Sequence, residues 1–142
     1  MDRVLIDTDI ILDFFFDRLP FSESAEKILI LCENKEIEGY VTPVIMSNLF
    51  YLLKKTAKRD KVIENLINLI GIVDVLNMNK EVVINSLYSE FKDFEDSLQY
   101  FSALNFGKIN YIISRNIKDY KYSSIKVMTA DEYINEYKFT LN

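Results

Sequence analysis

Two aspartates near the start of the chain, Asp7 and Asp9, are the first residues whose type and spacing could do chemistry. They follow Val4-Leu5-Ile6, an apolar triplet typical of a buried strand in a parallel sheet. Ligands bind at the carboxyl ends of strands in open α/β sheets, so we expect both carboxylates at a binding edge. Two like charges ~4 Å apart repel by about 4 kcal/mol at an effective dielectric of about 20. Because the chain has no histidine, a metal ion is the leading candidate for the cation that offsets this repulsion.

Further oxygen-bearing side chains occur where the fold should bring them to the same edge. They are Asn48 in the middle of an otherwise apolar helix, Asp93 and Asp96 at the start of a later helix, and Ser114, Asn116 and Asp119 after a later strand. Mg²⁺ and Mn²⁺ prefer hard oxygen ligands, usually one or two carboxylates together with waters and substrate phosphates. Such carboxylates are sufficient for a phosphodiester-cleaving site, in which the metal activates a water and offsets charge on the phosphate.

Most of these side chains also have a structural explanation. Asp93 is well placed as a helix N-cap, and Asp96 would favour the positive end of the same helix. Asp9 is expected to cap a helix over residues 10–16. Asn48 could be a satisfied core amide, and Asp119 a turn residue. Asp7 ends a buried strand and is the hardest to explain structurally, which makes it the strongest functional candidate.

Strand-like and helix-like segments alternate along the chain, which predicts a single α/β domain over residues 1–142 with a sheet of four or five mainly parallel strands. The strands are expected at residues 4–6, 38–41, 72–76, 110–113 and 126–128, the third of them at an edge because it contains Asp74. The helices are expected at residues 10–16, 21–36, 43–55, 60–71, 79–88 and 93–105, and after a capping box at 129–132. Asp60 is expected to cap the fourth of these helices.

Composition narrows the possible chemistry. The lack of histidine excludes Ser-His-Asp and Cys-His nucleophiles and His-ligated zinc, and the three scattered glycines make a phosphate-binding loop improbable. No apolar run approaches the roughly 18–20 residues of a membrane span. The N-terminus lacks signal-peptide features and the single cysteine, Cys32, cannot form an internal disulfide. We therefore expect a cytoplasmic protein.

Basic residues form two local clusters in a chain whose net charge is −5. That net charge argues against broad electrostatic capture of nucleic acid but leaves room for a nucleic-acid enzyme with local basic patches. The clusters are Lys54, Lys55, Lys58, Arg59 and Lys61, and Arg115, Lys118 and Lys121. Solvated helix ends are the structural explanation for either cluster.

The order and context of these segments resemble the PIN domain family. The resemblance covers essentially the whole chain and lies in residues 4–9, 41–51, 93–99 and 113–120. It implies a three-layer α/β/α sandwich with a central, mainly parallel sheet. It also implies a metal-dependent nuclease that uses Mg²⁺ or Mn²⁺. Many bacterial PIN domains are the toxin half of VapBC-type toxin–antitoxin pairs and cleave RNA.

The resemblance assigns roles to residues of this chain. Asp7 and Asp96 would ligate the metal directly, and Asp119 would ligate it through water or orient the attacking hydroxide. The usual glutamate of the third helix falls at Asn48, which adds no negative charge, so we expect weaker metal binding than in the four-acid form. Under the nuclease hypothesis itself, we expect Asp9, Asp93, Ser114 and Asn116 to support the site, and Arg115, Lys54, Lys55 and Lys58 to bind the RNA backbone.

Two other functions compete with the nuclease. Asn48 favours a PIN-fold module that has lost catalysis and binds RNA or a partner protein. Haloacid dehalogenase-type phosphatases also place Asp-x-Asp after their first strand, but this chain has a bulky Ile11 where that family has Thr or Val, and it is short for the fold. For the nuclease, RNA is the expected substrate, an antitoxin a possible partner, and the apolar third helix is compatible with a homodimer.

Overall fold

The computed structural model describes the backbone of residues 1–141 and the side chains of residues 1–139. Its strands are β1 (Arg3–Ile6), β2 (Glu38–Val41), β3 (Val73–Val75), β4 (Tyr111–Ile113) and β5 (Lys126–Met128). They form one parallel sheet in the order β3-β2-β1-β4-β5. The apolar residues of β1, Val4 to Ile6, are fully buried at its centre. The residue that follows β1 therefore leaves the sheet at the middle of its carboxyl edge.

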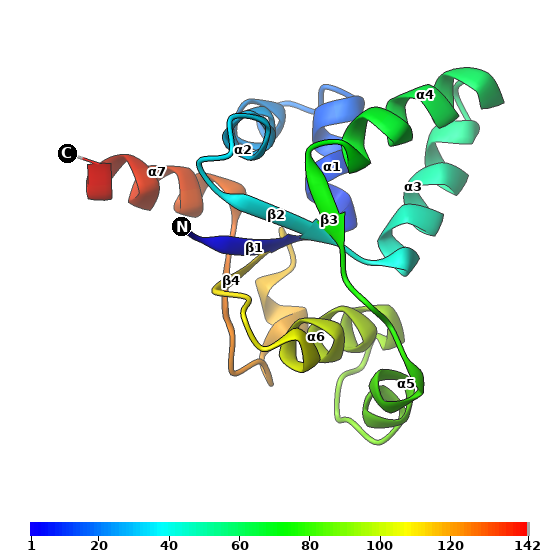
Figure 1. Ribbon diagram of the computed structural model, residues 1–142, viewed down its shortest axis with the longest axis vertical. Helices are drawn as coiled ribbons and strands as arrows, with labels where there is room; N and C mark the ends of the chain where they lie inside the picture. Colours follow the sequence, from blue (N-terminus) through cyan, green and yellow to red (C-terminus); the bar gives the residue numbers. More distant parts are fainter. Residues whose placement is uncertain (142) are drawn as a thin grey trace.

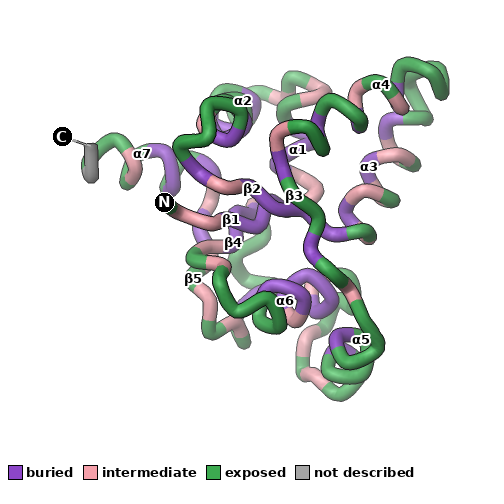
Figure 2. The backbone as a smooth tube through the Cα atoms, viewed as in Figure 1, coloured by how far each residue is buried: buried purple, intermediate pink, exposed green. Residues whose placement is uncertain are grey.

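Helices cover both faces of this sheet (Figure 1). They are α1 (Thr8–Phe15), α2 (Ser22–Glu33), α3 (Pro43–Lys54), α4 (Arg59–Ile70), α5 (Lys80–Leu87), α6 (Phe94–Phe106) and α7 (Ala130–Leu141), with a 3₁₀ helix η1 at Ile117–Tyr120. Helices α1 to α4 lie on one face and α5 and α6 on the other, while α7 packs against α2. The buried backbone is concentrated in the strands and the inner sides of the helices (Figure 2). The predicted α/β/α sandwich is confirmed.

Several local predictions are also confirmed. Strands β2 and β5 have the predicted bounds, and β3 lies at an edge of the sheet. Thr42 caps α3 by accepting a hydrogen bond from the Ile45 N–H at 3.1 Å, and Pro43 occupies the first helical position. The capping box before α7 is formed by reciprocal bonds between Thr129 and Glu132.

Two predicted helix starts are wrong. Helix α1 begins at Thr8, and its N-cap is Asp7, whose backbone is extended (φ −70°, ψ 158°). The chain thus passes from β1 into α1 with only Asp7 between them, and Asp9 lies in the first helical turn. Helix α4 likewise begins at Arg59, so Asp60 lies in its first turn. Both aspartates still carry negative charge near the positive end of a helix, which is why they resemble caps in sequence.

None of the helices in the described part of the chain is long and apolar enough to cross a lipid bilayer.

Candidate active site

A cleft of about 330 Å³ opens at the carboxyl edge of the sheet, where β1, α3, α6 and η1 come together. Its neutral lining residues include Thr8, Asn48, Gln99 and Asn116. Its acidic lining residues are Asp7, Asp9, Asp93, Glu95, Asp96 and Asp119. The structure therefore brings together the acidic residues that the sequence placed after β1, at the start of α6 and after β4.

Asp7 is the most deeply placed of these carboxylates, with 8% of its surface exposed. Its Oδ1 accepts the Thr8 N–H at 2.8 Å, and its Oδ2 accepts the hydroxyls of Ser114 at 2.9 Å and Tyr120 at 3.2 Å. Burial raises the pKa of Asp7, and these hydrogen bonds only partly offset that effect. The carboxylate is thus held firmly but in surroundings that disfavour its charge.

Asp96 faces Asp7 across the Tyr120 hydroxyl, which lies 3.4 Å from Asp96 Oδ1. Burial raises the pKa of Asp96 to about 7, with further contributions from the negative charges of Asp7, Asp93 and Asp119. The buried Tyr120 hydroxyl has one proton, so it can donate fully to only one of the two carboxylates. Negative charge in this cleft therefore exceeds what the surrounding hydrogen bonds compensate.

The start of α6 is fixed from two sides. Asp93 is its N-cap, as predicted, and accepts the Asp96 N–H at 3.0 Å. The buried Gln99 side-chain oxygen accepts a hydrogen bond from the Thr42 hydroxyl at 2.5 Å, which ties α6 to the N-cap of α3. The first turn of α6 and the middle of α3 are thereby held on opposite walls of the same cleft.

Glu95 is a cleft residue that the sequence analysis did not assign. Asn48 is only partly buried, and its amide Nδ2 donates to Glu95 Oε2 at 2.9 Å. Successive helical residues point about 100° apart, so Glu95 is directed toward α3 while its neighbour Asp96 is directed toward Tyr120. Its position beside Asp96 in the 93–99 segment was the available signal. The cleft thus contains a carboxylate next to the position where Asn48 lacks one.

The turn after β4 forms the third wall. Ser114 is fully buried beneath Asp7, and the Asn116 amide donates to Asp9 Oδ2 at 3.3 Å. Asp119 belongs to η1 rather than to a simple turn, and its exposed side chain lines the mouth of the cleft. The structure thus gives Ser114 and Asn116 direct contacts with carboxylates of the cleft.

The donor set fits a hard divalent cation. Every charged group in the cleft lining is a carboxylate. The raised pKa of Asp96 has burial as its first cause and the negative charge of neighbouring carboxylates as its second, and a cation would offset that charge. Among the described residues, no three acidic side chains are already grouped closely enough to hold a metal ion. Mg²⁺ usually takes only one or two direct carboxylates and completes its shell with water and phosphate. Asp7 and Asp96, which share one hydroxyl contact, fit that role.

Comparison with known proteins decides the family. A family model for the PIN domain matches residues 3–118 of the chain. The chain belongs to the PIN domain family. This membership replaces the haloacid dehalogenase alternative considered from the sequence. A search of curated proteins gives no match.

Solved structures with the same fold include bacterial toxin–antitoxin proteins. A chain of a toxin–antitoxin complex from Klebsiella pneumoniae is 21% identical to this PIN domain, with a TM-score of 0.67 over 89% of this chain and 97% of that one. A chain of Rickettsia felis VapBC2, bound to a promoter DNA fragment, is 12% identical with a TM-score of 0.66, covering 89% and 98%. Mycobacterium tuberculosis VapC20, a sarcin–ricin loop cleaving toxin, is 12% identical with a TM-score of 0.60, covering 77% and 86%. At these identities the likeness establishes the fold.

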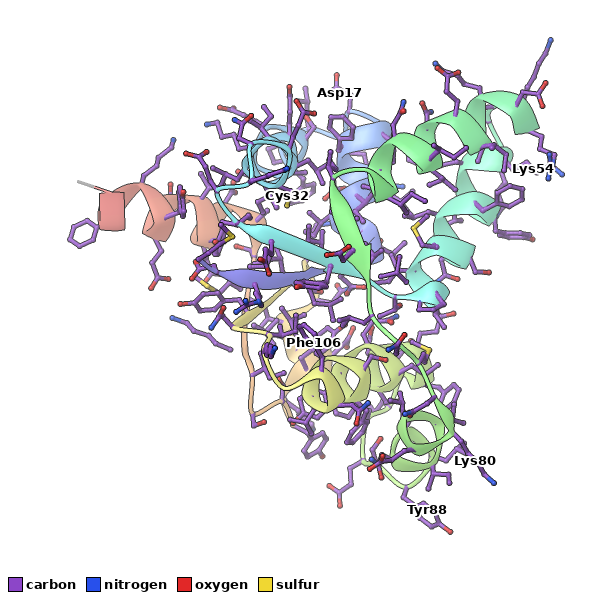
Figure 3. All side chains as sticks on the ribbon, in the orientation of Figure 1. Asp17, Cys32, Lys54, Lys80, Tyr88 and Phe106 are labelled. Carbon is purple, nitrogen blue, oxygen red and sulfur yellow. The ribbon has the colours of Figure 1, made fainter. Side chains whose placement is uncertain are left out.

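The basic residues assigned to RNA from the sequence occupy different positions in this PIN domain. Arg115 is engaged within the protein: its Nε lies 3.2 Å from Asp13 Oδ2, and its guanidinium stacks 4.4 Å from the centre of the Phe21 ring. Lys54 and Lys58 are exposed at the α3–α4 end, and Figure 3 shows Lys54 at the outer end of α3. The Nζ atom of Lys55 lies 5.0 Å from the centre of the Tyr51 ring, and Tyr51 lines the cleft.

Proposed function

We propose that this PIN domain is a Mg²⁺- or Mn²⁺-dependent endoribonuclease that acts as the toxin of a toxin–antitoxin pair. The observation that carries the proposal is the oxygen-lined cleft in which the carboxylates of Asp7 and Asp96 meet at the single hydroxyl of Tyr120. Family membership supports nuclease chemistry, and the fold shared with VapC20, a toxin that cleaves the sarcin–ricin loop, supports the substrate class.

In the proposed reaction, Asp7 and Asp96 would hold the metal, which when bound would supply an activated water and offset charge on the phosphate. Ser114 and Tyr120 keep Asp7 in place through their hydroxyls. Asp119, at the mouth of the cleft, orients the attacking water and accepts its proton. Asp93 positions Asp96 by capping α6, and Asn116 positions Asp9.

The contact between Asn48 and Glu95 favours this enzyme over a catalytically lost binding module. Asn48 suggests lost catalysis because it removes one negative charge from the site. Glu95 lies within hydrogen-bond distance of Asn48 and lines the same cleft, so it supplies a carboxylate from α6 instead of α3. We infer that the site retains the charge needed for metal binding.

The function is tested by incubating the protein with single-stranded and structured RNA. We expect cleavage with millimolar Mn²⁺ or Mg²⁺, its loss in EDTA, and its return when metal is added back. A metal at ~100 times its dissociation constant should also raise the free energy of unfolding by about 2.7 kcal/mol. If Mn²⁺ produces no RNA cleavage and no stabilisation of the protein, the result favours the binding module instead.

Replacing Glu95 with glutamine is predicted to weaken Mn²⁺ binding roughly fivefold, because a charge near the cation contributes about 1 kcal/mol in a water-exposed site. Glutamine keeps the size of the side chain and can still accept the Asn48 hydrogen bond. The dissociation constant is measured by calorimetry or by the electron paramagnetic resonance signal of free Mn²⁺. Glu81→Gln, an exposed change in the first turn of α5, is the matched control. Equal Mn²⁺ affinity of the Glu95 variant and the control would remove Glu95 from the site.

We also propose an antitoxin partner and a homodimer for this PIN domain. The antitoxin is supported by the solved structures that share the fold, several of which are toxin–antitoxin complexes. A groove of about 390 Å³ between α1, α2 and α4, lined by Phe14, Leu29, Ile30 and Leu69 among others, offers apolar surface for a partner. Exposed apolar side chains at the end of α5, among them Leu87 and the C-cap residue Tyr88, offer a second surface.

A further inference from the structure

A second hollow, of about 380 Å³, adjoins the acidic cleft, and its lysines outnumber its aspartates by three to two. It is lined by Lys92, Asp93, Lys118, Asp119, Lys121 and Tyr122. Asp93 and Asp119 also line the acidic cleft, so the two hollows share a wall. A chain-like ligand that occupies the acidic cleft can therefore continue directly into the second hollow.

The lysines of this hollow are available to bind an anion. In the part of the chain that the structure describes, none of Lys92, Lys118 and Lys121 has a carboxylate within ion-pair distance, although other lysines do. All three are exposed. They come from the loop before α6 and from the end of η1, so the fold gathers them from two segments. These three lysines form a local cluster of positive charge beside the acidic cleft, in a chain whose net charge is −5.

Tyr122 gives the hollow an aromatic surface as well. Its side chain is 48% exposed, and its ring lies 6.2 Å from the ring of Phe91, centre to centre. Phe91 in turn stacks on Tyr100 at 5.2 Å, so the ring of Tyr122 rests on an ordered aromatic cluster. Lys121 Nζ lies 5.0 Å from the centre of the Tyr122 ring. A positive groove with an exposed aromatic ring is the arrangement that binds single-stranded nucleic acid through phosphates and base stacking.

We propose that this hollow binds the RNA strand next to the bond being cleaved, with its phosphates on Lys92, Lys118 and Lys121 and a base stacked on Tyr122. The inference rests on the proposed function for its choice of RNA, but it concerns binding rather than cleavage. It assigns the substrate contacts to these four residues. It does not assign them to Lys54, Lys55, Lys58 or Arg115. The mixture of lysines with an aromatic ring favours a nucleic acid over an acidic peptide, which needs no stacking surface.

The test is the affinity for a fluorescein-labelled single-stranded RNA of about twelve nucleotides, measured by anisotropy in EDTA so that no cleavage occurs. The Lys92→Gln/Lys118→Gln/Lys121→Gln variant is expected to bind roughly tenfold more weakly at ~50 mM salt. Its slope of log affinity against log salt should be smaller by about 2, since each phosphate contact on a single strand contributes ~0.7. Tyr122→Ala should lose roughly tenfold, and Tyr122→Phe should bind like the wild type.

The matched control is Lys35→Gln/Lys108→Gln/Lys126→Gln, which removes the same charge near the amino-terminal edge of the sheet. This control is expected to keep the wild-type salt slope. Equal slopes for the two triple variants, or no effect of Tyr122→Ala, would overturn the proposal, and so would tighter binding of polyglutamate than of RNA. RNA binding through this hollow without cleavage in Mn²⁺ would contradict the proposed nuclease and leave this inference standing.

Discussion

Replacing Asp96 with asparagine is expected to reduce RNA cleavage by roughly 10³-fold and, in the same protein, to raise the melting temperature measured without metal. Activity falls because Asp96 is one of the two carboxylates proposed to hold the metal. Stability rises because burial and the charges of Asp7, Asp93 and Asp119 all disfavour the Asp96 carboxylate. Asparagine keeps the shape and removes the charge. A residue with a purely structural role would not give this opposed pair of effects.

The gain in stability should depend on pH in a defined direction. The pKa of Asp96 rises from its ordinary value of 3.8 to about 7 in the folded protein, so the folded state binds this proton more tightly than the unfolded state. The free energy of unfolding of the wild-type protein therefore falls as pH rises from ~4 to ~7. The Asp96→Asn variant has no carboxylate at this position, so its free energy of unfolding does not fall for this reason. Its advantage should be largest above pH 7 and disappear toward pH 4.

Melting in EDTA across this pH range, followed by melting in millimolar Mn²⁺, measures both effects. The metal should stabilise the wild-type protein and have little effect on the variant, so the order of stability reverses when Mn²⁺ is added. Asp74→Asn, at an exposed position of β3, is the control for losing a carboxylate elsewhere. A variant that still cleaves RNA, or that is less stable than the wild type at every pH, would contradict the assignment of Asp96.

The sheet and most helices could be predicted because their signals are local. Strands buried on both faces appear as short apolar runs, as in residues 4–6, and caps such as Thr42-Pro43 fix a helix start within three residues. The start of α1 could not be fixed in this way. Asp7 and Asp9 are both good capping residues, and the choice depends on how β1 leaves the sheet. That exit is set by the pairing of β1 with β2 and β4, which the local sequence does not contain.

The candidate site was predictable in its residue types and only partly in its contacts. The position of Asp7, Asp96 and Asp119 at one cleft follows from strand order and helix starts, and the structure places all three there. Tyr120 and Glu95 were missed because their roles depend on side-chain direction across elements: Tyr120 points from η1 to Asp7, and Glu95 points from α6 to Asn48. The sequence holds no such signal for Tyr120, and for Glu95 it holds only the position beside Asp96.

The contacts of Arg115 also could not be predicted from the sequence, and replacing this residue has the largest effect on stability that we expect. The sequence suggested an RNA contact, whereas the structure places the Arg115 guanidinium beside Asp13, a carboxylate with 0% of its surface exposed. Arg18 is a second partner of Asp13, at 3.6 Å. Burial raises the pKa of Asp13, and the two arginines oppose that shift. Arg115 therefore chiefly compensates a buried charge on α1, one residue from Ser114 in the turn that holds Asp7.

Arg115→Met is accordingly predicted to lower the free energy of unfolding by about 3 kcal/mol, because it leaves the buried Asp13 with only the more distant Arg18. The double variant Asp13→Asn/Arg115→Met should recover more than half of this loss, since it removes the stranded charge as well. Urea denaturation of the wild type, the two single variants and the double variant completes the cycle. Cleavage should follow stability, falling in Arg115→Met and returning in the double variant. If Arg115 instead contacts RNA, Arg115→Met will keep its stability, and the double variant will not regain RNA binding.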